Sequence, residues 1–244
     1  STVDPNRIVV YTMNRHQDQL CLYAVNPRTT VAQLLIKESV PKYVQESAVE
    51  AIKFVGNNII LPSDRSGYMN LYIYNMNGHL QRTIGGKFDI TEVYGYDAKT
   101  GDVYYQAAAL APTDRQIYVS HKNGKTERLT DAEGWNSALF SGDYQYFINT
   151  WSDYNTPYVY TTRTRSGKVI STLQDNRELR QTIKDYGFCK REAFSFTTSE
   201  GVTLNGWMLR PLNFDASKRY PVIMHQYSGP GSQQVKNAWS AGSM

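Results

Sequence analysis

Cysteine is scarce in this 244-residue chain, which contains only Cys21 and Cys189. Neither cysteine belongs to a Cys-x-x-Cys motif or has a pair of histidines nearby. This argues against both a disulfide-stapled scaffold and a structural metal site. We therefore expect no metal and no other cofactor. The surroundings of the two cysteines favour free, buried thiols, and a disulfide between them is the alternative.

Long apolar runs and runs of like charge are also missing. The longest apolar stretches cover about six residues, whereas a helix needs about 20 to span a bilayer. The net charge is only +4 and is spread along the chain, so a nucleic-acid-binding patch is not expected. The N-terminal residues 1–5 lack the basic and apolar regions of a signal peptide. The chain has no starting methionine, which favours a piece trimmed from something longer.

Tyrosine, in contrast, is abundant, with 19 residues, and aromatic rings pack well on pleated sheets. Four segments repeat one layout of strands joined by short polar turns: 7–35, 58–84, 102–130 and 144–172. Their tight turns fall at residues 27, 78, 124 and 167, with spacings of 51, 46 and 43. One propeller blade has about 40–50 residues. Asn-Gly pairs at 77–78 and 123–124 are strong hairpin signals.

The predicted fold class is therefore mainly β, a partial β-propeller of about four four-stranded antiparallel blades. Polar clusters connect the second and third strands of three blades, at 63–67, 111–115 and 152–156. Their aspartates are most simply turn formers.

The repeat ends after Thr172. A short capped helix is predicted over 177–186, then a hairpin over 192–210 and an apolar strand over 221–227. The strand leads into a Gly-rich loop at 228–232. The predicted domains are the propeller blades over 1–175, a linker with the helix over 176–190, and the start of a second domain over 191–244.

The run Tyr220-Pro-Val-Ile-Met-His-Gln-Tyr-Ser-Gly-Pro-Gly-Ser-Gln-Gln-Val235 resembles the early strand and oxyanion loop of the prolyl oligopeptidase clan. Its Tyr-Ser-Gly-Pro-Gly-Ser-Gln form at 227–233 resembles the dipeptidyl peptidase IV branch, and Gly206–Pro211 resembles that family's entry into its α/β-hydrolase domain. The resemblance implies that residues 191–244 are the first strands of such a domain. It also implies that Tyr227 donates a hydrogen bond in the oxyanion hole.

What the resemblance implies for function is a serine peptidase with a Ser-Asp-His triad. Such enzymes release X-Pro or X-Ala dipeptides from peptides with a free N-terminus, and members are often homodimers. We expect a bacterial, periplasmic or secreted enzyme, with no nucleic-acid partner. The chain contains no Gly-x-Ser-x-Gly and no Glu-Glu motif. The nucleophile, acid, base and amine anchor should therefore lie outside it, and the fragment alone is predicted to be inactive.

Other residues near Tyr227 are weaker candidates. His225 could suggest a catalytic base, but the family's base comes later in the chain, so a hydrogen-bonded strand residue is the better interpretation. Ser228 and Ser232 lack the strand–turn–helix setting of a nucleophile. Two alternatives remain open: an acylaminoacyl or prolyl oligopeptidase relative, and a stand-alone propeller that serves as a protein-binding scaffold.

Overall fold

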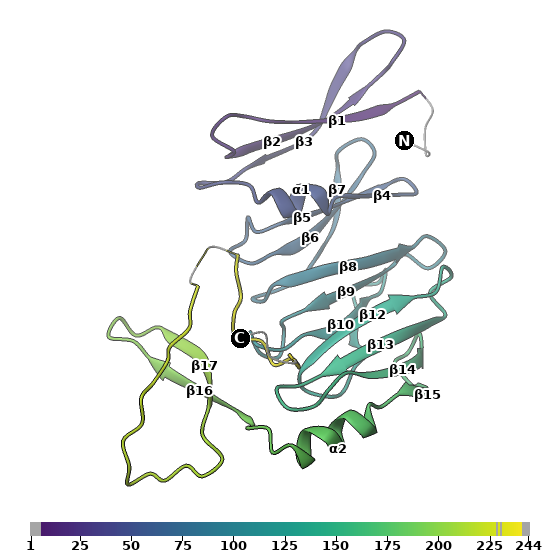
Figure 1. The fold of residues 1–244 in the computed structure, drawn as a ribbon. Helices are drawn as coiled ribbons and strands as arrows, with labels where there is room; N and C mark the ends of the chain where they lie inside the picture. Colours follow the sequence, from purple (N-terminus) through teal and green to yellow (C-terminus); the bar gives the residue numbers. More distant parts are fainter. Residues whose placement is uncertain (1–5, 228, 230, 241–244) are drawn as a thin grey trace. The chain divides into compact units, whose positions relative to one another are not determined.

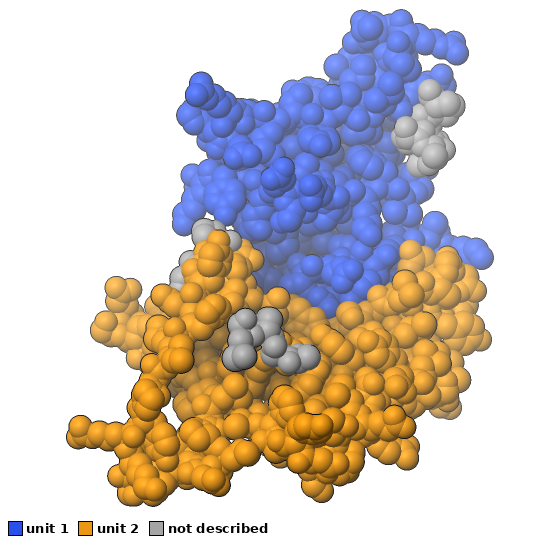
Figure 2. Space-filling model, in the orientation of Figure 1, with its two compact units in different colours: residues 1–109, 118–127 blue, residues 110–117, 128–244 orange. Residues whose placement is uncertain are grey.

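The computed structural model describes residues 6–227, 229 and 231–240, and antiparallel sheets dominate it (Figure 1). The chain divides into two compact units (Figure 2). Unit 1 comprises residues 1–109 and 118–127, and unit 2 comprises residues 110–117 and 128–244. Among the described helices, none is long and apolar enough to cross a membrane.

Two antiparallel sheets lie within unit 1. The first has the order β1-β2-β3, with bounds Ile8–Met13, Gln19–Val25 and Ala32–Ser39. The second has the order β4-β5-β6-β7, with bounds Lys53–Val55, Asn58–Ser63, Asn70–Asn75 and Leu80–Ile84. A single short helix turn, α1 (Glu46–Glu50), lies between them in the sequence.

The second sheet is buried on both faces because its side chains alternate. Ile59 and Leu61 of β5 join an apolar cluster that also contains Leu20 and Leu22 of β2. Ile60, between them, points to the other face and joins a second cluster with residues of β8 and β9. The period of two in strand side chains thus builds two cores from one strand. Face-to-face packing of successive sheets is the packing expected of propeller blades.

The third sheet has the order β8-β9-β10-β11, with bounds Ile90–Asp97, Asp102–Ala107, Gln116–Ser120 and Thr126–Arg128. The fourth lies in unit 2 and has the order β12-β13-β14-β15, with bounds Trp135–Phe140, Tyr146–Ser152, Val159–Thr164 and Val169–Gln174. These sheets confirm the predicted fold class of a mainly β chain with propeller blades. In the first blade the structure describes three strands.

The sequence patterns missed the strand that opens each of the later blades, namely β4, β8 and β12, and also the turn α1. The hairpin turns were predicted correctly: Gly78, Gly124 and Gly167 all have positive φ, between 81° and 88°. The cysteines are free, as expected, but Cys189 is exposed and only Cys21 is buried. The expectation of two buried thiols was therefore wrong for Cys189, which follows helix α2 at the surface.

After the fourth sheet, helix α2 (Arg177–Asp185) and the hairpin β16-β17 (Arg191–Thr197, Thr203–Leu209) follow as predicted. The N-cap residue Asn176 makes no side-chain capping bond, but Asp175 before it accepts a hydrogen bond from the backbone N–H of Arg177 at 3.1 Å. Gly187 ends the helix with a φ of 63°.

The apolar strand predicted over 221–227 is wrong. The segment has no regular secondary structure, and Val222, Ile223 and Met224 are 79–97% exposed. An apolar run becomes a strand only when neighbouring strands satisfy its backbone groups, and no described strand pairs with it. The interpretation of His225 as a strand residue is wrong for the same reason, and its side chain is exposed. Of the second domain, the structure describes a hairpin but no parallel sheet, and the predicted domain boundaries stay a prediction.

Candidate functional site

Tyr227 is the one predicted site residue, and it lies at the end of the irregular segment 221–227. Its side chain is 68% exposed. The ring lies against the backbone of Gly229, where an added Cβ would be only 2.4 Å from the ring atom Cε1. Any larger residue at 229 would therefore push the ring away. Ser228 and Pro230, on either side of this glycine, lie outside the described residues.

The chain that follows Tyr227 is tied through Gln233 to the loop before β10, within unit 2. Its side-chain oxygen accepts a hydrogen bond from Nη2 of Arg115 at 2.5 Å. Its Nε2 donates to the carbonyl oxygen of Pro112 at 2.7 Å and to that of Val235 at 2.9 Å. Both ends of the amide are thus used, which fixes the orientation of the side chain.

Arg115 is itself held firmly in the loop just before β10. It is only 7% exposed, and its Nη1 donates to the carbonyl oxygens of Pro112 (3.1 Å) and Asp114 (2.7 Å). The guanidinium carbon lies 4.4 Å from the ring centroid of Trp135, and Nζ of Lys236 lies 5.3 Å from the same centroid. Cation–π contacts of this kind favour a fixed guanidinium plane.

Asp114 provides a second attachment point, through Asn237. Its Oδ2 accepts a hydrogen bond from the backbone N–H of Gly134 at 2.8 Å, and its Oδ1 accepts one from Nδ2 of Asn237 at 3.2 Å. Asn237 also accepts from the backbone N–H of Tyr154 at 3.1 Å and donates its own N–H to the carbonyl oxygen of Thr113 at 2.9 Å. Asp114 is 6% exposed, so these bonds satisfy a buried carboxylate.

A third attachment lies at Trp239. Its backbone N–H donates to Oγ of Ser152 at 3.1 Å, and its carbonyl oxygen accepts from the hydroxyl of Tyr158 at 3.3 Å. Residues 233–239, hereafter the docked segment, therefore contact the polar clusters 111–115 and 152–156. The aspartates of these clusters include a turn former, since Asp153 accepts bonds from the backbone of Asn155 and Thr156. Asp114, however, binds residues that are distant in the sequence.

Next to the docked segment, unit 2 contains an open cleft of about 760 Å³. Its lining includes Asp114 and Tyr154 from the polar clusters, Asp131 and Glu133, and residues 193–195 of β16. Burial, and then the nearby charge of Asp114, raises the pKa of Tyr154, while Arg191 partly opposes the shift. Hydrogen bonds from the backbone lower the pKa of Asp131. Tyr154 is therefore a neutral phenol and Asp131 a carboxylate at neutral pH.

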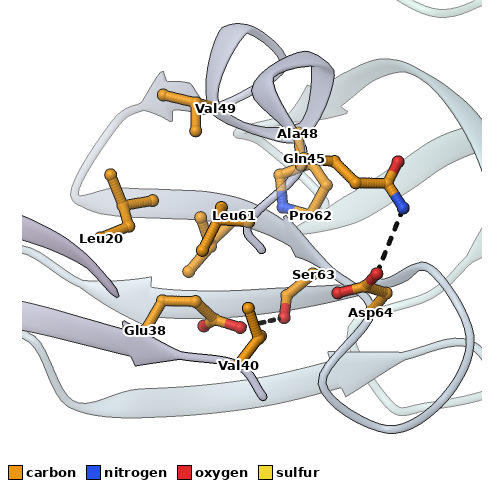
Figure 3. A pocket seen from close by; sticks show the side chains of 11 residues that line it. Leu20, Glu38, Val40, Gln45, Ala48, Val49, Leu61, Pro62, Ser63 and Asp64 are labelled. Atoms are coloured by element: carbon orange, nitrogen blue, oxygen red, sulfur yellow. Dashed lines mark hydrogen bonds between the residues drawn. The ribbon is translucent and has the colours of Figure 1, made fainter. Parts of the chain in front are cut away.

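A smaller pocket in unit 1 lies between α1, β3 and β5 (Figure 3). Its volume is about 10 Å³, so it holds at most one water molecule. It is therefore not a substrate site. Among the described residues, no group of three His, Cys, Asp or Glu side chains could hold a metal ion.

Tyr227 thus lies just before a segment that the blades hold in place. His225 and Ser232 do not form a catalytic arrangement with it. Ser232 lies in the turn, where its N–H donates to the carbonyl oxygen of Gly229. Sequence reasoning missed the roles of Arg115 and Asp114. Their place in the polar cluster 111–115 was noted, but a partner about 120 residues away leaves no local signal.

Comparison with known proteins identifies a family model over most of the chain. The model for the dipeptidyl peptidase IV (DPP IV) N-terminal region matches residues 2–158. Among curated proteins, the chain is 28% identical to a probable dipeptidyl peptidase 4 of Aspergillus flavus, covering 96% of the chain and 32% of that protein. It is 32% identical to dipeptidyl peptidase 4 of Arthroderma otae, covering 73% of the chain and 24% of that protein.

Solved structures give the same result. The crystal structure of Porphyromonas gingivalis dipeptidyl peptidase 4 matches with a TM-score of 0.91 and 36% identity, covering 96% of this chain and 34% of that one. A putative dipeptidyl aminopeptidase IV of Bacteroides ovatus shares the fold, with a TM-score of 0.82 and 23% identity. The chain spans about a third or less of the length of the curated relatives that it matches.

Proposed function

The chain belongs to the dipeptidyl peptidase IV family, and on this basis we propose that it forms part of a serine exopeptidase. The whole enzyme releases X-Pro or X-Ala dipeptides from peptides with a free N-terminus. A Ser-Asp-His triad carries out acyl transfer. We place this triad outside the chain because the sequence given contains no Gly-x-Ser-x-Gly motif. The match to relatives named dipeptidyl peptidase 4 over 96% of the chain supports this proposal.

Within this enzyme, Tyr227 donates a hydrogen bond to the oxyanion of the tetrahedral intermediate. A phenol suits this role because it is neutral at pH 7 and offers one O–H donor on a rigid ring. The observation that carries the assignment is the seating of the Tyr227 ring against Gly229, in a loop whose downstream end is anchored at Gln233. An exposed ring on an anchored loop can contact a substrate while its position stays restricted.

The partners and location that go with this function are also proposals. The substrates are peptides with a free N-terminal amine, the full-length enzyme is a homodimer, and it works in the bacterial envelope or outside the cell. The fragment lacks the triad, so it is inactive by itself.

Activity on paired substrates tests the function. The full-length protein should release p-nitroaniline from Gly-Pro-p-nitroanilide but not from the N-acetylated form of the same amide. The 244-residue chain alone should release none from either. Preferential cleavage of the acetylated amide would instead identify an acylaminoacyl or prolyl oligopeptidase relative. No cleavage by the full-length protein would favour a binding scaffold.

A further inference from the structure

The docked segment begins six residues after Tyr227, and the residues between them contain two glycines. Gly231 has a φ of 68°, which glycine adopts without strain. Tyr227 itself is 68% exposed and lies outside any strand. Neither sheet pairing nor burial of its own ring therefore fixes the tyrosine.

An oxyanion donor nevertheless needs a fixed position. Its hydroxyl must lie about 2.7–3.1 Å from the place where negative charge develops. A misplacement of about 1 Å can lower the rate about a hundredfold. Something outside the segment 221–232 must then hold the loop, and the anchor nearest in sequence is the pair of Gln233 and Arg115.

The geometry of this pair is that of a built anchor. Arg115 is buried, and two carbonyl oxygens and the ring of Trp135 set its guanidinium plane independently of Gln233. The carbonyl oxygen of Pro112 accepts from both Arg115 and Gln233, which closes a three-membered network. A charged donor also makes a stronger hydrogen bond than a neutral one.

We propose that Arg115 is a positioning residue for Tyr227: by holding Gln233, an arginine of the propeller blades fixes the downstream end of the loop that carries Tyr227. Asp114 gives the same loop a second anchor through Asn237. This inference rests on the proposed function of Tyr227. Arg115 itself touches neither substrate nor reacting atoms, and it acts only through the docked segment.

A double-mutant cycle in the full-length enzyme tests the coupling, with Gly-Pro-p-nitroanilide as substrate. Tyr227→Phe should lower kcat on the order of 10²–10³-fold. Arg115→Ala should lower kcat between about tenfold and a hundredfold, with a smaller change in KM. If Arg115 acts through the Tyr227 hydroxyl, the double variant should be no slower than Tyr227→Phe by more than about threefold. Effects that multiply would overturn the proposal.

Three variants separate positioning from general damage. Arg82→Ala is the matched control, because Arg82 also donates to backbone carbonyl oxygens, those of His121 and Gly101, but within unit 1. It should leave kcat within about twofold of wild type. Gln233→Ala should reproduce the loss seen in Arg115→Ala. Gln233→Glu keeps an acceptor for the guanidinium but sets a carboxylate oxygen against the carbonyl oxygens of Pro112 and Val235, so it should recover only part of that loss. Equal losses in Arg82→Ala and Arg115→Ala would refute positioning.

Hydrogen exchange gives a readout that does not depend on activity. Amides of residues 231–240 in the full-length protein should exchange at least tenfold faster in Arg115→Ala and Gln233→Ala than in wild type or Arg82→Ala. Unchanged exchange would overturn the anchor even in an active enzyme. An inactive wild type with faster exchange in these variants would refute the proposed peptidase function and leave the anchor in place.

Discussion

Removing Arg65 should destabilise unit 1, because it leaves a carboxylate buried without its cation. Glu38, on β3, is only 4% exposed, and its oxygens accept hydrogen bonds from Oγ of Ser63 at 2.5 Å and from Nη2 of Arg65. Figure 3 shows the carboxylate of Glu38 beside Ser63 at the end of β5. Arg65 also donates to the hydroxyl of Tyr74 at 2.8 Å and covers the ring of Tyr72 at 4.1 Å.

The structure sets the size of this effect. Breaking a buried ion pair by removing one partner costs about 3–5 kcal/mol. The Arg65 side chain is 29% exposed, so water screens part of the interaction, and we expect about 3 kcal/mol for Arg65→Met. Replacing both partners, as Glu38→Leu with Arg65→Met, removes the stranded charge. It leaves the hydroxyl of Ser63 without this acceptor, at a cost of about 1 kcal/mol.

The assay is native-state hydrogen exchange on amides of β3 and β5 in the full-length protein, which reports the free energy of local opening. Arg65→Met should lower that free energy more than the double variant does. If the double variant lowers this free energy by as much as the two single variants added together, the loss in Arg65→Met does not come from leaving the Glu38 carboxylate without its cation. A loss below about 1 kcal/mol in Arg65→Met would refute the reasoning as well.

Two more predictions concern a turn and a buried tyrosine. Gly124→Ala should lower the free energy of unfolding by about 1–2 kcal/mol, because the only penalty is the strain of a positive φ. Gly78→Ala also places a Cβ 2.0 Å from the carbonyl oxygen of Leu35. This clash should cost about 1–3 kcal/mol more. Equal losses of hydrogen-exchange protection would contradict this difference. Burial raises the pKa of Tyr105 to about 12. Because the folded-state pKa is the higher one, stability is intact below about pH 10 and falls by about 2–3 kcal/mol between pH 10 and 12. Alkaline unfolding of Tyr105→Phe should lack that part of the fall, and an unchanged slope would disprove it.

Much of the propeller could be predicted from the sequence, because inner strands such as β5 and β6 are continuous apolar runs bounded by turn residues. The strands that open the later blades were not predicted, for physical reasons. β4 is only three residues long, and register shifts in the pairing of β8 with β9 blur its alternation. In β12 a buried position is polar, which breaks the apolar pattern expected of a strand. Asn136 is 1% exposed and donates to the backbone carbonyl oxygens of Arg115 and Ala132.

The candidate site was only partly predictable. The Gly-rich motif identified Tyr227, because the motif is local in the sequence. The contacts of Arg115 and Asp114 with the docked segment depend on how distant loops meet, which no local pattern encodes. The strand predicted over 221–227 was wrong because apolar composition alone does not supply the neighbouring strands that a sheet requires.

The most direct test of the account is the kinetics of Tyr227→Phe in the full-length enzyme. The substitution removes one hydroxyl and keeps the ring that lies against Gly229, so the loop should keep its position. With Gly-Pro-p-nitroanilide, kcat should fall on the order of 10²–10³-fold while KM changes little, since the hydrogen bond forms to the transition state. A kcat within about threefold of wild type would contradict the assignment of Tyr227 as the oxyanion donor.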